Sequence, residues 1–290
     1  MKKQSPYCAT TSCCQQGIAL IAVLWIVAAL SVVVTGVVHS VRSEVRVINH
    51  NRQALEGLAL GQAAIALVLQ DISVRAQRPA QLMQIDVVYL GHAMQVQVMP
   101  LSGLIDINSA SEPLLISLYS VVGAKNEAVA TALAQATLQV RGERDTRGRE
   151  KGFEAAQDLL RVPGVDFDLY ARLSPLITAE VQGGSGRVNP QAAPVEVLAV
   201  LAQGNLALAG DLAAKRASGA TDMDTTRLNA PFIGNLASSR YKLQARVPFA
   251  DGIQVVVSHS VDARPDSRSG LPWRVFHTEY WTQAGPMAGV

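Results

Sequence analysis

The hydrophobic pattern is dominated by an apolar run at residues 18–38, where 21 consecutive positions carry no charged side chain. At about 1.5 Å of rise per residue, a helix of this length is roughly 32 Å long and matches the hydrocarbon core of a bilayer. A short polar leader that contains Lys2 and Lys3 joins the run directly. We therefore expect residues 18–38 to form a transmembrane helix.

The helical pattern continues beyond the apolar run. From residue 41 to residue 70, apolar side chains recur at spacings of three and four among charged ones, which predicts one long helix leaving the membrane. Residues 71–79 turn polar and end in Pro79, which predicts that the helix stops there. Residues 86–99 alternate apolar and polar side chains on both sides of Gly91 and His92, the pattern of a β-hairpin.

Between residues 103 and 204 the pattern is helical again and contains an internal echo. Asn108 and Pro113 have the same spacing as Asn189 and Pro194, about eighty residues later. Asparagine can cap free backbone amides and proline is tolerated in a first turn, so both segments are predicted helix starts. Residues 153–160 predict another helix, closed by residues 162–164, and the charged run at residues 141–151 predicts a solvated loop.

The last third of the chain is strand-like. Residues 241–247, 253–261 and 273–281 have the composition of strands, and turn-forming segments separate them. Three strands in succession predict an antiparallel sheet, and residues 284–290 are expected to be a disordered tail. The order of strands, helices and strands indicates an α+β fold.

Composition adds two constraints. Of the 290 residues, 49% are hydrophobic, which is enough to bury a core, and all three cysteines precede Gly17. A chain cleaved after Gly17 would have no thiol and no disulfide. It would also lose Lys2 and Lys3 and keep 23 basic and 23 acidic side chains, so strong nonspecific attraction to nucleic acid is not favoured.

The bond between Gly17 and Ile18 is the predicted site of proteolytic cleavage. A secretory signal is cleaved at small residues that follow its apolar region, whereas here the small residue precedes that region. Glycine at this point lets a protease approach the backbone closely. The segment resembles the leader of a type IV prepilin or pseudopilin, which a prepilin peptidase cuts after the glycine. An uncleaved signal anchor is the alternative reading of the same residues.

Further segments extend the resemblance over nearly the whole chain. Together with the leader, they resemble the type II secretion system protein K family, the general secretion pathway minor pseudopilin K. They are residues 53–61 (Gln-Ala-Leu-Glu-Gly-Leu-Ala-Leu-Gly), 107–110 (Ile-Asn-Ser-Ala), 158–164 (Asp-Leu-Leu-Arg-Val-Pro-Gly) and 188–194 (Val-Asn-Pro-Gln-Ala-Ala-Pro).

The resemblance implies a pilin-like long helix packed on an antiparallel sheet, with an inserted, mostly helical domain related to SAM-like or helix-hairpin-helix modules. The implied division is a cleaved leader (1–17), the transmembrane part of the helix (18–38), the periplasmic helix with the first strands (39–102), the helical insertion (103–235), the C-terminal strands (236–283) and the tail (284–290). The implied role is to initiate or cap the tip of a periplasmic pseudopilus that drives export of folded proteins. The implied partners are minor pseudopilins I and J, other pseudopilins, the prepilin peptidase and the inner membrane.

The resemblance also sets the expected location and cofactor. It places the chain as a single-pass protein of the bacterial inner membrane with its C-terminal region in the periplasm. The charges do not fix this orientation, because three arginines follow the apolar run while only two lysines precede it. No cofactor is certain, and calcium is expected only because family members are thought to carry it.

One departure from ordinary pilins concerns Ala22, the fifth residue counted from Ile18. Most pilins and pseudopilins have a glutamate there, which is thought to pair with the amino terminus of the neighbouring subunit. A carboxylate in an apolar environment requires such a partner, so a subunit with none above it has no use for the acid. Protein K is similar in lacking it, although Ala22 is also an ordinary apolar residue of a membrane helix.

Two alternative functions remain. A minor pilin of a type IV pilus would share the same leader and helix. A membrane-anchored helix-hairpin-helix protein that binds DNA would explain the turn at residues 160–164, where backbone amides approach phosphates. However, residues 103–200 contain 9 basic and 12 acidic side chains, and a negative net charge repels a phosphate backbone.

The sequence offers little support for a catalytic site, and the chain is expected not to be an enzyme. The five histidines are scattered, and the glycine-rich segment at residues 183–186 lacks the lysine of a phosphate loop and the arrangement of a nucleophile elbow. Two pairs of carboxylates are weak calcium candidates because they supply oxygen ligands, but no metal ligand is assigned. They are Asp166 with Asp168 and Asp222 with Asp224.

Overall fold

The computed structural model describes residues 15–75, 77–144, 148, 150–179, 185–219, 223–235, 238–250, 252–267 and 270–285. Most of the expected leader and the end of the expected tail therefore lie outside the described residues. The chain divides into two compact units, Met1–Glu56 and Gly57–Val290.

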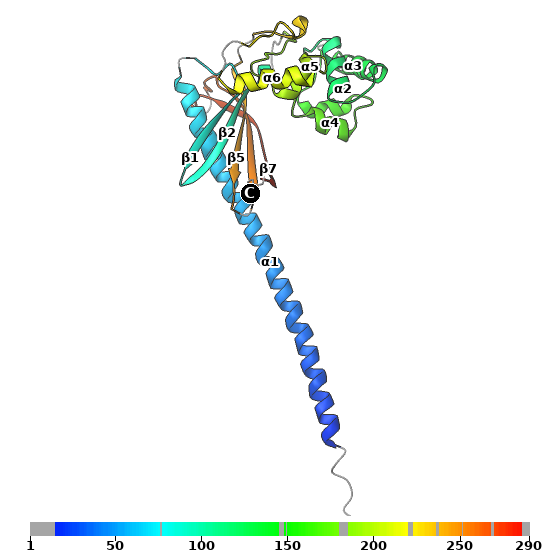
Figure 1. Cartoon of the computed structure of the whole chain (residues 1–290), viewed down its shortest axis with the longest axis vertical. Coiled ribbons are helices and arrows are strands. Elements are labelled where there is room, and N and C mark those ends of the chain that lie inside the picture. The colour runs from blue at the N-terminus through cyan, green and yellow to red at the C-terminus, as the bar shows by residue number, and fades with distance from the viewer. Residues whose placement is uncertain are drawn as a thin grey trace, which may run out of the picture. The chain divides into compact units, whose positions relative to one another are not determined.

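Helix α1 extends from Gln15 to Val74 (Figure 1). It continues the apolar run without a break and ends inside the polar segment that precedes Pro79. The prediction of one long helix is therefore confirmed. Its last turns, from Gly57 onward, belong to the second unit.

A five-stranded antiparallel sheet forms the next layer, in the order β1-β2-β5-β6-β7. The strands are β1 (Met83–Tyr89), β2 (His92–Pro100), β5 (Arg240–Pro248), β6 (Ile253–Asp262) and β7 (Arg274–Ala284). The hairpin prediction is confirmed: β1 and β2 turn at Leu90 and Gly91, whose φ angles of 50° and 82° are those of a tight two-residue turn. The α+β class and the antiparallel sheet are confirmed as well.

The inner face of the sheet packs against α1. Along β5 every second side chain is buried, so Leu243 and Ala245 face α1 while Lys242 and Gln244 face the other side. The buried side chains that α1 contributes to this layer are Leu60, Ala64, Ile65, Val68, Leu69 and Ile72. Helix α1 thus fills one side of a two-layer core with its apolar stripe.

Two glycines let α1 approach the sheet closely. A Cβ on Gly57 would lie 2.6 Å from Cβ and Cγ2 of Val255, and a Cβ on Gly61 would lie 2.5 Å from Cγ2 of Val257. Real carbon atoms do not pack at these distances. Their spacing of four residues places both glycines on the same helical face, directly over strand β6.

The helical insertion lies in the chain between β2 and β5 and has its own core. Its elements are η1 (Leu101–Gly103), β3 (Ile105–Asp106), α2 (Glu112–Val121), α3 (Glu127–Arg141), η2 (Ala156–Arg161), α4 (Phe167–Leu173), β4 (Ile177–Thr178), α5 (Val195–Leu201), α6 (Leu206–Ala217) and η3 (Ala230–Phe232). Strands β3 and β4 form a short parallel pair. Leucines of α2, η2 and α4 and aliphatic side chains of α5 fill this second core.

The prediction that Asn108 and Asn189 cap helices is wrong. Helix α2 begins after Ser111 and α5 begins after Pro194, although Pro113 does lie in the first turn of α2. The Asn108 amide instead bridges other segments: Nδ2 donates to the carbonyl oxygens of Phe153 (2.8 Å) and Ala179 (3.0 Å), and Oδ1 accepts from the amide of Phe153 (2.8 Å). Sequence spacing revealed the two related segments but not the distant backbone that these side chains reach.

Three further predictions need correction. Residues 153–160 do not form an α-helix, because only the short 3₁₀ helix η2 forms there. Ala284 belongs to β7 rather than to a tail, and residues 286–290 lie outside the described residues. Arg141 ends α3 and donates to the carbonyl oxygen of Ala110 (2.9 Å), so the charged segment begins as part of the fold rather than as a solvated loop.

Candidate functional site

The predicted processing residues lie in the first turns of α1. Gly17 and Ile18 follow the helix start at Gln15, and Ala22 is exposed on the same helix. The described side chains of this segment are strongly exposed, with Leu20 at 72% and Trp25 at 71%. Exposed apolar side chains on all sides are typical of a helix that lies in lipid or among other helices, and they are consistent with a single-pass membrane anchor.

A second part of α1 is also apolar but has a different role. Among the described residues, Asn51–Val74 is the helix long and apolar enough to cross a membrane by length and composition, and 44% of its apolar 18-residue window is buried. Its buried side chains cover the sheet, so we assign it to the protein core. The apolar helix Leu20–Thr35 is shorter than the predicted span, whose remaining side chains lie outside those described.

The apolar residues at positions 41–69 predict either a contact with a partner or a helix face that the chain's own sheet covers. The structure shows that the two faces of this helix differ. In the part from Gly57 onward, Ile65 and Val68 are covered by the sheet of the same chain. On the opposite face Leu67 is 43% exposed and Ala66 is also exposed. One face of this helix is therefore used internally, while the other is open.

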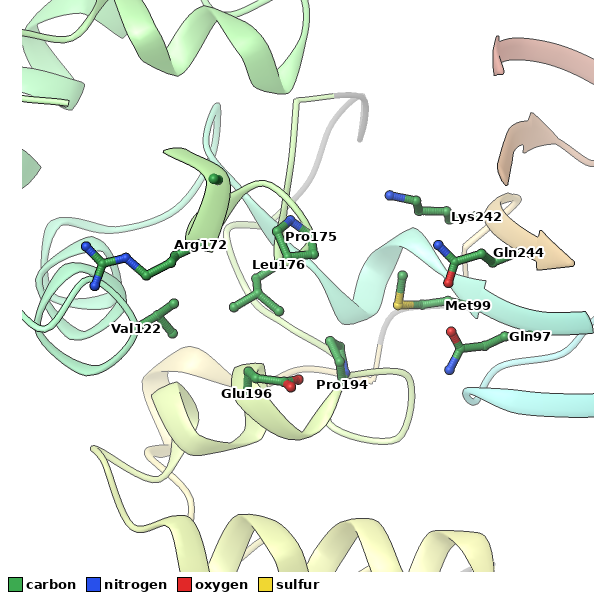
Figure 2. Close-up of a pocket in the computed structure, with 11 residues that line it drawn as sticks. Gln97, Met99, Val122, Arg172, Pro175, Leu176, Pro194, Glu196, Lys242 and Gln244 are labelled. Carbon is green, nitrogen blue, oxygen red and sulfur yellow. The ribbon is translucent and has the colours of Figure 1, made fainter. Parts of the chain in front are cut away.

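A cleft opens between the outer face of the sheet and the insertion, and its first cavity has a volume of about 410 Å³ (Figure 2). Figure 2 shows Gln97, Met99, Lys242 and Gln244 reaching in from β2 and β5. The remaining labelled side chains come from the insertion: Val122, Arg172, Pro175, Leu176, Pro194 and Glu196. An apolar floor with a few convergent polar groups is the usual composition of a binding pocket.

A second cavity of about 510 Å³ continues the cleft toward β7 and shares Pro175, Lys242 and Gln244 with the first. Its polar end contains His277 and Glu279, whose Nε2 and Oε1 atoms are 2.7 Å apart. Burial raises the pKa of the nearby Tyr170 hydroxyl, and the negative charge of Glu279 raises that pKa further. The sequence pattern did not predict this cleft, although the alternating glutamines and lysine of β2 and β5 indicated the outer face of the sheet.

Hydrogen bonds beside the cleft connect Asn189 of the insertion to η1 and to the segment before β1. The amide of Asn189 donates to Ser102 O (2.7 Å), and its side-chain Nδ2 donates to Ala80 O (3.0 Å). Gly103 lies so close to this segment that a Cβ would come within 2.2 Å of the Ala192 carbonyl oxygen. Nη1 of Arg216 then donates to Ala193 O (2.6 Å). These contacts hold residues 189–193 against η1, the segment before β1 and α6.

Two of the carboxylates considered for calcium make hydrogen bonds within the chain. Asp166 caps α4 by accepting from the amide of Leu169 (2.7 Å), and Asp224 accepts from the Thr226 hydroxyl (2.6 Å). Asp222 lies outside the described residues. Among the described residues, no group of three or more histidine, cysteine or acidic side chains could hold a metal ion.

Acidic side chains flank the turn that resembles a helix-hairpin-helix motif. Gly164 adopts φ 89° between η2 and α4. However, the carboxylate of Asp158 accepts from the amides of Glu154 (2.8 Å) and Ala155 (3.2 Å) on one side of the turn, and Asp166 caps α4 on the other. The negative charges of these two carboxylates repel a phosphate near the turn.

A buried carboxylate, Asp262, forms ion pairs at the end of β6 and the start of β5. The Asp262 side chain is 5% exposed and accepts from Nε of Arg264 (2.9 Å) and Nε of Arg240 (3.4 Å). Burial alone would raise the pKa of Asp262, but the hydrogen bonds and charges of the two arginines outweigh it and lower this pKa to about 2. The carboxylate therefore stays ionised at neutral pH and fixes the ends of β5 and β6.

Comparison with solved structures found chains that resemble this one. No family model matches the sequence, and no curated protein matches it. The structure resembles one chain of the GspK-GspI-GspJ complex from the type 2 secretion system of enterotoxigenic Escherichia coli. The match covers 84% of this chain and 99% of that chain, at 16% sequence identity and a TM-score of 0.48.

Proposed function

We propose that this chain is a minor pseudopilin of a type II secretion system, processed after Gly17 and anchored in the inner membrane by the helix that begins at Ile18. The observation that carries the proposal is the continuity of one helix. An apolar segment that directly follows a polar leader continues as α1 and ends as the layer that covers an antiparallel sheet. This arrangement lets the same helix pack in lipid and afterwards among the helices of a filament.

The proposed role is structural rather than enzymatic. Ala22 removes the carboxylate through which an ordinary pilin pairs with its neighbour, which suits the tip of the filament. The helical insertion adds bulk to the sheet and would block addition of another subunit above it. Minor pseudopilins I and J are the proposed partners, and the soluble part is proposed to lie in the periplasm.

The first experiment is co-expression of the full chain with a prepilin peptidase, followed by mass spectrometry of the membrane-extracted product. The expected product begins at Ile18, and Gly17→Val should prevent cleavage. Gly36→Val is the matched control, because it makes the same change within the apolar segment and should leave cleavage intact. A wild-type product that retains Cys8, Cys13 and Cys14 would contradict the proposal and support a signal anchor.

The tip role is tested separately by co-purification with minor pseudopilins I and J from the same genome. We expect a stable complex that survives in moderate salt. Binding of the chain to a labelled DNA duplex in a salt-sensitive manner, without a complex with the two pseudopilins, would favour the DNA-binding alternative instead.

A further inference from the structure

The cleft between the sheet and the insertion contains charged and polar side chains that lack partners. Among the described residues, no hydrogen bond or ion pair involves the side chains of Lys242, Glu196 or Gln97, although all three line the first cavity. Lys242 and Gln97 extend from central strands of the sheet, and Glu196 from the first turn of α5. Their positions are therefore set by rigid elements rather than by loops.

The shape of the cleft favours an extended ligand. The two cavities share Pro175, Lys242 and Gln244, so the space continues from Pro194 at α5 to Trp281 on β7. Its floor includes Met99 and Leu176, which are 9% and 3% exposed. A compact ligand would fill only one cavity, whereas an extended segment can place one side chain in the first cavity and continue into the second.

The charges indicate what such a segment carries. Lys242 on the sheet wall can pair with an anion, and Glu196 near Pro194 can pair with a cation (Figure 2). The amide of Gln97 can both donate to and accept from a peptide main chain. An apolar side chain between them would contact Met99 and Leu176.

From this complementarity we infer that the cleft binds an extended segment of a partner protein in which an apolar residue lies between an acidic residue and a basic one. The acidic side chain pairs with Lys242 and the basic side chain pairs with Glu196, while the apolar side chain fills the cavity of about 410 Å³. This inference does not depend on the proposed assembly role, because it rests on the cleft alone.

The test uses methionine methyl NMR on the full chain in detergent micelles. Met99 lines the cleft, whereas Met94 and Met223 lie in the two separate cores and serve as internal references. The probe is the peptide acetyl-Gly-Asp-Leu-Lys-Gly-amide, titrated to about 5 mM, which detects the weak affinity expected of a short peptide. We expect a saturable shift of the Met99 signal and no shift of the other two.

Two comparison peptides separate the contributions. Replacing the leucine of the probe by glycine, or both charged residues by serine, should weaken binding about tenfold each. Lys242→Glu should weaken the original probe similarly and should bind better to a peptide with lysine in place of the aspartate. Lys215→Glu, the same change on the exposed end of α6, should alter neither affinity.

Three results would overturn the inference. They are an unmoved Met99 signal, equal affinities for all the peptides, and a Met99 shift that depends on protein concentration without peptide. The last of these would mean that a second copy of the chain covers the cleft. Unchanged Met94 and Met223 signals in the Lys242→Glu variant show that it remains folded, so a loss of binding there cannot be attributed to unfolding.

Discussion

The close contact between α1 and β6 leads to a sharp prediction for Gly61→Ala. The new Cβ would lie 2.5 Å from Cγ2 and 3.0 Å from Cβ of Val257. Because carbon atoms pack at about 3.5–4.0 Å, the helix must move roughly 1 Å away from the sheet. The side chains of Leu60 and Ala64 would then lose part of their packing against the strands.

The magnitude follows from two opposing effects. Overpacking of a filled core costs about 1–3 kcal/mol, while replacing glycine by alanine within a helix contributes about 1 kcal/mol in the other direction. The net loss of unfolding free energy is about 0–2 kcal/mol for Gly61→Ala. For a folded unit of this size the midpoint of thermal unfolding should fall by up to about 8 °C.

The assay is thermal and denaturant unfolding followed by circular dichroism, with Gly210→Ala as the matched control. Gly210 lies in α6, and a Cβ there meets no atom within 4 Å, so this variant should gain about 0.5–1 kcal/mol. The double variant with Val257→Ala lacks the obstructing methyl group. Its loss of unfolding free energy should therefore be smaller, by about 1 kcal/mol, than the sum of the losses in the two single variants. If Gly61→Ala stabilises the protein as much as Gly210→Ala does, the close packing of α1 on β6 is wrong.

Three further predictions concern other parts of the fold. Asp262→Asn should lower the unfolding free energy by about 1–3 kcal/mol at pH 7, measured by urea unfolding. Arg264 and Arg240 lower the pKa of Asp262 to about 2, so the carboxylate stabilises the fold above its unfolded pKa near 4 and this stabilisation is lost as the pH falls from about 5 to 2. The unfolding free energies of wild type and variant should therefore converge over that range. A difference in unfolding free energy that stays constant at all pH values would contradict this. Asn108→Asp should be less stable than Asn108→Ala by calorimetry, because a carboxylate would face two carbonyl oxygens that now accept from Nδ2, and the reverse order would disprove the bridging role. Ile65→Ala should lower the unfolding free energy by about 2–5 kcal/mol and Leu67→Ala by less than 1 kcal/mol, because the two side chains are 1% and 43% exposed. Equal losses of unfolding free energy in chemical unfolding would mean that α1 presents a different face to the sheet.

The local elements were predictable because local forces decide them. The spacing of apolar residues predicted α1, and the alternation around Gly91 predicted the β1–β2 hairpin. The three C-terminal strands also formed close to their predicted positions, although β7 extends three residues further than predicted, to Ala284. Each of these patterns indicates which side chains are buried, and the pattern can be recognised within a few neighbouring residues.

The roles of several polar residues were not predictable in the same way. Asn108 and Asn189 had the local signature of helix caps, yet their side chains bond to Phe153 and to Ala80, which are distant in sequence. A local cap and a distant backbone group offer an asparagine hydrogen bonds of similar energy, so only the packing of the insertion selects between them.

The sequence by itself determined the polar leader, the apolar segment, the alternating strands and the absence of cysteine after Gly17, because each depends only on residue type and spacing. Only the tertiary structure decided that β2 pairs with β5, that Gly57 and Gly61 lie against β6, and that Lys242 and Glu196 line one cleft. These arrangements depend on segments brought together by burial of two separate cores. The free energy of that burial is a sum over many distant contacts, and no single stretch of sequence carries it.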